Sequence, residues 1–481
     1  MMMSLQTALQ WIPGGRLSGD GNVAIERVHS DTRSVAQGDL FVAIRGERFD
    51  ANEMLADARA RGAAAALCLP GASGGFAMTG LPCIEVDNTI AALGALARGW
   101  RSQFTLPLIA VTGSNGKTTV TQMVAAILRA AEPDAAFATQ GNLNNDIGLP
   151  LTLLRLRATH ALGVVELGMN HPGEIATLAA IAQPTVALIN NAQREHMEFM
   201  ATIEAVAREN GSVIDALPAD GQVVVPADDA FTPLWREMAN KRRVWTFVLG
   251  QGAQASVTAA EPVWADGAWQ VDASTPQGAL RFKLSIAGRH NVKNSLAAAA
   301  CALAAGVPLA AVAAGLSAFE PVKGRSRALA LRIDGRTLTL VDDAYNANPD
   351  SVEAAIDVLA ALPAPRLLVL GDMGEVGSEG PRFHTEAGEQ ASRAGIEHVF
   401  ALGAQSAHSV ASFGTGRHFE DIDTLLAALR TQLPSVASVL VKGSRFMKME
   451  RVVDALVAQG QPAPHAQEQK QEHAEGRSHA A

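Results

Sequence analysis

The sequence predicts an α/β protein with three domains, and three observations lead to this prediction. The chain has 481 residues, and at roughly 150 residues per domain this length indicates about three domains. Apolar segments of strand length alternate with segments of helical character, which is typical of parallel sheets flanked by helices. Hydrophobic residues make up 48% of the chain and charged residues 18%, so each domain can bury a core.

The predicted N-terminal domain, residues 1–104, is small and mixed. Residues 39–44 are a strand candidate that ends at Gly46. Residues 51–61 have helical character, and residues 63–69 are apolar enough for a buried strand. We therefore expect a small α/β domain here.

The predicted central domain, residues 105–320, opens with an apolar strand that leads into a glycine loop and then a helix. Two further buried strands alternate with helical stretches, which implies a parallel sheet. The stretch 221–288 contains short strands and turns, and we interpret it as an antiparallel excursion. The expected elements are the strands 106–111, 161–167 and 185–191 and the helices 117–131 and 291–305.

The predicted C-terminal domain, residues 321–460, begins with a hairpin around Asp334 and Gly335, a pair that favours a two-residue turn. Three later apolar strands each end in glycine and alternate with helical segments, so we expect a second α/β layer. The expected strands are 329–333, 337–341, 366–371, 398–403 and 438–443. Residues 461–481 are rich in Gln, His, Glu and Ala without apolar periodicity, and we expect a disordered tail.

Composition excludes several classes of protein. The net charge of -9 gives no overall attraction to nucleic acid or to an anionic membrane. No apolar run is long enough to span a bilayer, and the first residues do not resemble a secretory signal. The three cysteines, Cys68, Cys83 and Cys301, form no CxxC pair, so we expect buried small hydrophobes. We therefore expect a soluble cytoplasmic protein. We also expect a monomer, because no exposed apolar stripe is evident.

The sharpest motif is a shortened phosphate loop, GxxGKTT, placed between a predicted strand and a predicted helix. In such a loop, backbone N–H groups and the helix N-terminus bind phosphate oxygens. Lys117 adds a charge for the β- and γ-phosphates, and the Thr118 hydroxyl is a ligand for Mg²⁺. The sequence therefore predicts ATP binding through Thr112, Gly113, Ser114, Asn115, Gly116, Lys117, Thr118 and Thr119.

Two candidate metal ligands follow the next two strands of the predicted parallel sheet. Glu166 ends the strand 161–167, and His196 comes shortly after the strand 185–191. Ligands of open α/β sheets gather at the carboxyl ends of the strands, so both side chains reach the edge that carries Thr118. The alternatives are a solvated carboxylate at a strand end and a structural histidine. We predict that Thr118, Glu166 and His196 hold Mg²⁺.

Several sequence blocks, in this order, resemble the Mur ligase family, and within it the MurF type. The resemblance extends from about Ser30 to Met449. The shortened phosphate loop and a G-x-HN-x-x-N segment are typical of the whole family, and four further blocks are more specific to this type. The family segments are 112–119 and 288–294, and the more specific blocks are 139–150, 342–349, 370–375 and 441–445.

This resemblance implies an ATP-dependent, C–N bond-forming ligase with one domain for a UDP-sugar, one for ATP and a Rossmann-like domain that closes over both. ATP phosphorylates the terminal carboxylate of a UDP-N-acetylmuramoyl-tripeptide, and the amine of D-alanyl-D-alanine attacks the acyl phosphate. Charge must be neutralised where it builds up on the transferred phosphoryl group. The resemblance thus implies ATP and Mg²⁺ as cofactors in peptidoglycan synthesis, with Lys117, Glu166, His196 and Arg325 as catalytic residues.

The resemblance also implies contacts for individual residues. Arg325 meets the γ-phosphate, unless it is only a linker charge, and Asn294 contacts adenine in a pocket shaped by His290 and Asn291. The closing domain contributes Asp342 and Tyr345 to the nucleotide site. Tyr345 either stacks on adenine or fills a core, and Arg33 binds a substrate anion or is structural. The expected contacts with the other substrates are Asp31, Thr32, Arg33, Asn142, Asn145, Asn346 and Asn348.

One departure from the family concerns a lysine that many Mur ligases carry in carbamoylated form to bridge a second Mg²⁺. Asn210 stands at that position here, and an asparagine cannot form a carbamate. We expect the second metal to be held without it, with oxygens from Glu209 or water. The third residue of the tripeptide, diaminopimelate or lysine, stays open.

Two other functions compete with this reading. One is a ligase of the same fold that resembles folylpolyglutamate synthase and uses glutamate as the amine. The block 342–349 and the full first domain argue against it. The other is a nucleotide-dependent switch that performs no ligation.

Overall fold

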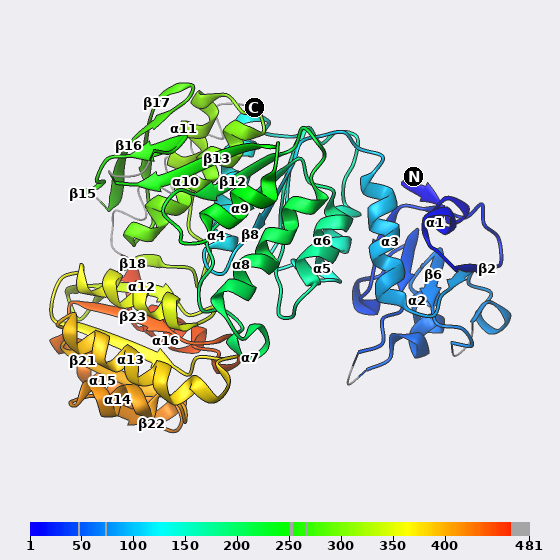
Figure 1. Ribbon diagram of the computed structural model, residues 1–481. Helices are drawn as coiled ribbons and strands as arrows, with labels where there is room; N and C mark the ends of the chain where they lie inside the picture. The colour runs from blue at the N-terminus through cyan, green and yellow to red at the C-terminus, as the bar shows by residue number, and fades with distance from the viewer. Residues whose placement is uncertain (47–48, 73–74, 251–253, 266, 463–481) are drawn as a thin grey trace, which may run out of the picture.

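The computed structural model describes residues 1–46, 49–72, 75–250, 254–265 and 267–462. Within these residues, three large sheets covered by helices follow one another along the chain, and a small two-stranded sheet pairs Met3–Ser4 with Ala24–Ile25. This arrangement confirms the predicted α/β class. Figure 1 shows the N-terminal part in blue on one side of the green central part, and the yellow and orange C-terminal part on another side. Within the described ranges, no helix combines the length and the apolar character that a bilayer crossing needs.

The N-terminal sheet has five strands in the order β2-β7-β6-β5-β4. The middle strands β5 and β6 are buried along their whole length. Cys68, Cys83 and Cys301 are buried without disulfides, as predicted. Helix α3 packs against two helices of the central part, α5 (Gly148–Leu153) and α6 (Glu174–Ala182), and so joins the two parts. The elements are β1 Met3–Ser4, α1 Leu5–Trp11, β2 Arg16–Ser18, β3 Ala24–Ile25, β4 Arg27–His29, η1 Thr32–Ser34, β5 Asp39–Val42, η2 Ala51–Met54, α2 Leu55–Ala60, β6 Ala65–Cys68, η3 Gly75–Thr79, β7 Cys83–Glu85 and α3 Thr89–Arg101.

The central sheet runs β15-β16-β14-β13-β12-β11-β8-β10-β9, with β17 paired to β16. Its parallel part spans β9 to β14, and antiparallel pairing starts only between β14 and β16. The elements are β8 Leu108–Thr112, α4 Lys117–Ala131, β9 Ala136–Ala138, α5 Gly148–Leu153, β10 Leu162–Glu166, α6 Glu174–Ala182, β11 Val186–Ile189, α7 Met197–Met200, α8 Ile203–Gly211, η4 Ser212–Ala216, β12 Gln222–Pro226, α9 Thr232–Ala239, β13 Arg243–Leu249, β14 Val257–Ala259, β15 Val263–Ala265, β16 Ala268–Thr275, β17 Gly278–Leu284, α10 Arg289–Ala304 and α11 Leu309–Ser317.

The prediction for residues 221–288 was therefore wrong in its first half, where β12, α9, β13 and β14 continue the parallel sheet. Val223, Val224 and Val225 are all buried, as expected for a parallel strand covered on both faces. Helix α9 has a proline in its first turn, a common helix start. Both signals were present in the sequence.

The C-terminal sheet runs β22-β21-β20-β23-β19-β18-β24 and is parallel from β22 to β19. The predicted hairpin joins β18 and β19, and both turn residues, Asp334 and Gly335, have positive φ angles of 48° and 79°, as a type I′ turn requires. The elements are β18 Arg327–Ile333, β19 Arg336–Asp343, α12 Pro349–Ala360, β20 Arg366–Gly371, η5 Gly377–Glu379, α13 Gly380–Arg393, β21 His398–Leu402, α14 Ala407–Phe413, β22 Arg417–Phe419, α15 Ile422–Gln432, η6 Leu433–Ser435, β23 Ser438–Lys442, η7 Arg445–Met447, α16 Glu450–Gln459 and β24 Gln461–Pro462.

The predicted tail begins two residues too early. Gln461 and Pro462 pair with β18 and extend the C-terminal sheet. The remainder of the predicted tail, residues 463–481, lies outside the described residues.

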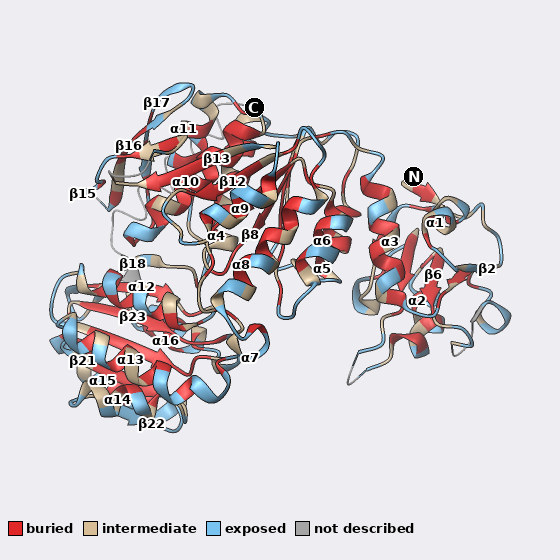
Figure 2. Ribbon diagram, in the orientation of Figure 1, coloured by how far each residue is buried: buried red, intermediate tan, exposed pale blue. Residues whose placement is uncertain are grey.

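The core explains the abundance of alanine. Helix α10 is buried on nearly all sides between α4 and the strands β11 to β13, and its small side chains permit this close packing. A Cβ atom on Gly315 of α11 would lie 2.3 Å from the Cα atom of Ile127, so α11 rests directly on α4. Figure 2 shows the buried residues concentrated in the strands and on the helix faces turned toward them. These layers hold the ends of β8, β10 and β11 at one edge.

Candidate active site

A cleft of about 1410 Å³ lies at the carboxyl ends of β8, β10 and β11, and residues of the C-terminal part line its other side. Among the residues that the structure describes, none before Ser114 lines it, so the N-terminal part stays outside. Asparagine is the most frequent residue type in the lining. The asparagines are Asn115, Asn142, Asn144, Asn145, Asn170, Asn190, Asn191, Asn291, Asn294, Asn346 and Asn348.

The phosphate loop connects β8 to α4, as the sequence predicts. Gly113 has a φ of +126°, and a Cβ atom there would lie 3.0 Å from the backbone nitrogens of Asn190 and Asn191. Gly116 takes the N-cap position of α4 with a φ of +82°, and no side chain caps this helix. Uncapped N–H groups at a helix N-terminus form an anion site, so the loop has the geometry that phosphate binding needs.

Lys117 makes three contacts in this structure. Its Nζ atom donates to the carbonyl oxygens of Gly113 and Ser114, at 2.6 and 3.1 Å, and to Glu195 Oε1, at 2.6 Å. Sequence reasoning missed Glu195, although it stands next to His196. The predicted phosphate ligand is thus paired with a carboxylate from the segment that follows β11.

Thr118 and Glu166 lie together as the sequence predicts. The Thr118 hydroxyl donates to Glu166 Oε1 at 3.3 Å, and Asn144, which the sequence analysis missed, donates to the same oxygen at 2.7 Å. Glu166 is only 2% exposed, and its Oε2 atom is buried without a hydrogen-bond partner. A buried carboxylate oxygen without a partner is costly, and a divalent cation would satisfy it.

The residues present therefore fit Mg²⁺ bound through few protein ligands. No cluster of three or more His, Cys, Asp or Glu residues suited to a metal occurs in the described part of the chain. Mg²⁺ in nucleotide sites commonly takes one or two carboxylates and completes its shell with phosphate oxygens and water. Thr118 and Glu166 suit that arrangement.

Arg325 reaches the phosphate loop from the junction of the two parts. Its Nη2 atom donates to the Thr118 hydroxyl at 3.3 Å, and its guanidinium carbon lies 4.1 Å from the centre of the Tyr345 ring. The Arg445 guanidinium lies 5.5 Å from the same ring. Tyr345 lines the cleft and is partly exposed, so it does not fill a core. Its stacking on adenine stays a prediction.

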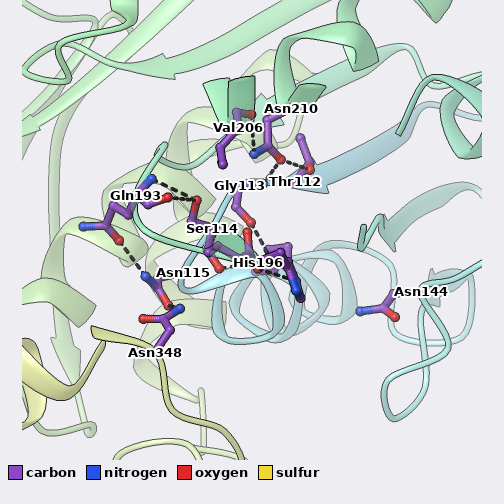
Figure 3. Close-up of polar contacts among 12 residues, drawn as sticks. Thr112, Gly113, Ser114, Asn115, Asn144, Gln193, His196, Val206, Asn210 and Asn348 are labelled. Carbon is purple, nitrogen blue, oxygen red and sulfur yellow. Dashed lines mark hydrogen bonds and ion pairs between the residues drawn. The ribbon is translucent and has the colours of Figure 1, made fainter. Parts of the chain in front are cut away.

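Asn294 and Asn291 of α10 join a network of amides beneath the loop. Asn190 Nδ2 donates to Asn294 Oδ1 at 3.0 Å and to the Asn115 carbonyl oxygen at 2.8 Å. Asn294 in turn donates to Asn291 Oδ1 at 2.9 Å. Asn348 Nδ2 donates to Asn115 Oδ1 at 2.9 Å and so ties the C-terminal part to the loop (Figure 3).

Asp342 has a different place from the one expected. It is 1% exposed, does not line the cleft, and accepts from the backbone N–H groups of Gly324 and Ala344. Burial raises the pKa of its carboxyl group. Its neighbour Asp343 lines the cleft and pairs with Lys442 at 2.6 Å. Asp342 therefore fixes the linker next to Arg325, and Asp343 faces the ligand space.

The expected substrate residues fall into two groups. Asp31, Thr32 and Arg33 lie in the N-terminal part, away from the cleft, where Arg33 pairs with Asp31 at 2.7 Å. The second group lines the cleft and consists of Asn142, Asn145, Asn346 and Asn348.

Asn210 braces the phosphate loop instead of facing the cleft. Its Oδ1 atom accepts from the Thr112 hydroxyl at 2.5 Å and from Gly113 N at 2.9 Å, and its Nδ2 atom donates to the Val206 carbonyl oxygen (Figure 3). Glu209 accepts from the backbone N–H groups of Gly173 and Ile175, at the start of α6. The expectation that Glu209 supplies oxygens to a second metal therefore loses its support.

His196 lies between two carboxylates. Its Nδ1 atom is 2.6 Å from Glu375 Oε2, and its Nε2 atom is 3.5 Å from Glu195 Oε1. Burial on its own lowers the pKa of His196, but the interactions with Glu195 and Glu375 outweigh burial and raise the pKa from 6.5 to about 9. The two carboxylates thus favour the protonated form of His196, which lies between the two parts. Binding a metal requires the imidazole to lose this proton.

This raised pKa predicts a loss of stability in alkaline solution. A histidine whose pKa is higher in the folded than in the unfolded protein stabilises the fold when protonated. The contribution is complete below pH 6.5 and disappears as the pH rises through about 9. We expect the melting temperature of the wild type to fall between pH 7 and pH 10 more steeply than that of His196→Gln. Parallel curves for the two proteins would contradict this pairing.

Comparisons with known proteins define the class. The family model described as "Mur ligase middle domain" matches residues 111–302, and the one described as "Mur ligase, glutamate ligase domain" matches residues 327–445. Fold, phosphate loop and both family models thus define an ATP-dependent ligase of the Mur class.

Individual relatives show which type of Mur ligase the chain resembles. A UDP-N-acetylmuramoyl-tripeptide–D-alanyl-D-alanine ligase of Escherichia coli K12 is 39% identical over 93% of this chain and 97% of its own. MurF from Acinetobacter baumannii matches with a TM-score of 0.85 and 33% identity, over 94% of this chain and 98% of its own. MurF ligase from Thermotoga maritima, solved in complex with ADP, matches with a TM-score of 0.79 and 25% identity, over 90% and 97% of the two chains. The chain belongs to the MurF family of D-alanyl-D-alanine-adding ligases.

Proposed function

We propose that the cleft binds ATP with Mg²⁺ in the cytoplasm, and that the chain uses it to join D-alanyl-D-alanine to UDP-N-acetylmuramoyl-tripeptide. The observation that carries this proposal is the uncapped phosphate loop with Lys117 at its end, beside a buried carboxylate oxygen of Glu166 that lacks a partner. The names of the relatives supply the two substrates. We propose that the protein acts as a monomer.

The first step makes the carboxylate an acyl donor. A terminal carboxylate oxygen of the tripeptide attacks the γ-phosphorus atom, and ADP leaves with the bond electrons. Lys117 turns toward the β- and γ-phosphate oxygens, and Arg325, already at the loop through Thr118, neutralises charge on the transferred group. Thr118 and Glu166 would hold Mg²⁺, which would neutralise phosphate charge, and His196 is a further candidate ligand.

In the second step the amine of D-alanyl-D-alanine attacks the carbonyl carbon of the acyl phosphate. The nitrogen of the tetrahedral intermediate gives up its extra proton to solvent. The C–O bond to the phosphate then breaks, inorganic phosphate leaves with the bond electrons, and the amide remains. We propose that Asn142, Asn145, Asn346 and Asn348 orient the reacting ends through neutral amide hydrogen bonds, since all four line the cleft. The adenine lies beside Asn294 and Asn291, with Tyr345 against it.

The nucleotide-sugar end of the substrate is held elsewhere. We propose that Asp31, Thr32 and Arg33 bind it in the N-terminal part, which contributes nothing to the cleft lining among the described residues. A long UDP-sugar peptide can bridge the two places, so that only its terminal carboxylate reaches the phosphate loop. Closure of the parts around it is expected, because the contacts lie on all three.

The test is an assay of phosphate release with each component omitted in turn. We expect release only when UDP-tripeptide, ATP, Mg²⁺ and D-alanyl-D-alanine are all present, and no release when glutamate replaces the dipeptide. Tripeptides with diaminopimelate and with lysine are assayed side by side, which decides the third position. A protein that binds ATP but forms no amide with any UDP-muramyl peptide would be a switch and not a ligase.

A further inference from the structure

Residues 193–196 lie between β11 and α7. Along this segment, side chains that contact the phosphate loop alternate with side chains that contact the C-terminal part. We call this segment the coupling segment. Gln193 accepts from Asn115 Nδ2 at 2.7 Å and donates its backbone N–H to the Ser114 hydroxyl at 2.9 Å (Figure 3). Glu195 pairs with Lys117 of the same loop. Arg194 and His196, in contrast, contact the C-terminal part.

Arg194 makes more contacts with the C-terminal part than His196 does. Its Nε and Nη2 atoms donate to Asp350 Oδ1 at 3.0 and 2.8 Å, and its backbone N–H donates to Asp350 Oδ2 at 2.7 Å. Its Nη1 atom donates to Glu386 Oε2 at 2.9 Å, and its guanidinium carbon lies 5.4 Å from the centre of the Phe383 ring. A guanidinium held by several acceptors in fixed geometry positions the backbone that carries it.

On the side of the phosphate loop, Glu195 is paired with Lys117, the lysine that we propose binds a phosphate. A lysine has three donors, and all three of Lys117 are used, by Gly113, Ser114 and Glu195. A phosphate must replace one of these acceptors, and Glu195 is the charged one, which the phosphate repels. Glu195 is 7% exposed, and its Oε2 atom is buried without a hydrogen-bond partner. When Lys117 turns to a phosphate, the buried Glu195 carboxylate loses its closest cation and keeps only His196, whose Nε2 atom lies 3.5 Å away. This loss is costly for a buried carboxylate, so we expect the coupling segment to shift.

We propose that the coupling segment links occupation of the phosphate loop to docking of the C-terminal part. Glu195 is the counter-ion that a phosphate displaces from Lys117, and Arg194 is the positioning residue that holds the segment against Asp350 and Glu386. The inference rests on the proposed role of the loop as an ATP site, and it deepens that role by naming the residues that compete with ATP and transmit its binding.

The experiment measures the dissociation constant of ATP by calorimetry with Mg²⁺ and without peptide substrates. We expect Glu195→Gln to bind ATP about tenfold more tightly, because the competing charge is gone. In an Arg194→Met background the same substitution should change the affinity by no more than about threefold, because the segment is no longer held in place. Arg194→Lys should retain part of the coupling, and each variant is checked for a wild-type circular dichroism spectrum.

A matched control is Arg382→Met. Arg382 lies near the same Glu386 and the same Phe383 ring, but within the C-terminal part, so its loss should leave ATP affinity within twofold. The inference is overturned if Glu195→Gln fails to tighten ATP binding, or if its effect is equal in both Arg194 backgrounds. Failure of the wild type to bind ATP would instead overturn the proposed function, so the two failures are distinct.

Discussion

Lys117→Ala retains the fold but lowers kcat/KM for ligation by about 10³-fold. The loss of a cation aimed at developing phosphate charge typically costs about 10²–10³ in rate, and ATP affinity falls in addition. The substitution has a structural cost as well, because the buried Glu195 then loses its closest cation and keeps only His196, 3.5 Å away. Removing one partner of a buried ion pair costs about 3–5 kcal/mol, and the side chains of this pair are 14% and 9% exposed.

A second substitution can remove the charge that Lys117→Ala leaves on Glu195. The double variant Lys117→Ala/Glu195→Gln removes this charge, so it should regain the melting temperature of the wild type while staying inactive. Lys241→Ala, at an exposed lysine, serves as the surface control and should behave as the wild type. Phosphate release and thermal melting are measured on all three. Wild-type turnover in Lys117→Ala would disprove the role of the loop.

Glu166→Gln separates metal binding from folding. The new side chain can still accept from Thr118 and Asn144 through one oxygen, but it presents an amide N–H group where the carboxylate has its unpartnered oxygen. We expect kcat to fall by about 10²-fold or more, because the charge stabilisation supplied by a metal is worth several kcal/mol. The buried charge also disappears, so without Mg²⁺ the variant should melt at the same temperature as the wild type or higher.

A second measurement makes this prediction independent of activity. Ligands that bind the folded state raise the melting temperature, so Mg²⁺ with ATP should stabilise the wild type more than ATP alone. In Glu166→Gln this extra increment should vanish. Glu132→Gln, at an exposed position just after α4, should keep it. An unchanged increment in Glu166→Gln would show that the metal is held elsewhere.

Local patterns made much of the fold and part of the site predictable. The phosphate loop, the helix Lys117–Ala131 after it and the hairpin at Asp334 were all predicted and are all present. Each depends on residues close together in the sequence. The position of Glu166 next to Thr118 was also predictable, since neighbouring parallel strands end at one edge.

The remainder depends on tertiary packing, which local patterns do not specify. Asp342 and Asp343 are adjacent, and in a strand successive side chains point to opposite faces, so the register of β19 decides which one reaches the cleft. Glu195 and Arg194 belong to no motif. Lys117, the partner of Glu195, lies 78 residues earlier in the chain, and Asp350, the partner of Arg194, lies 156 residues later. The direction of β12 to β14 was misjudged although the sequence carries an apolar valine run and a proline at the start of α9, both typical of a continuing α/β layer.

The amide-rich lining of the cleft has a consequence for ageing of the protein. Asparagine is among the residues that heat degrades chemically, and Asn115, Asn190 and Asn294 all support the phosphate loop. Hydrolysis of one such amide to aspartate would place a permanent negative charge where we propose that the triphosphate binds. After prolonged storage at warm temperatures, we therefore expect molecules that remain folded but have lost their affinity for the nucleotide.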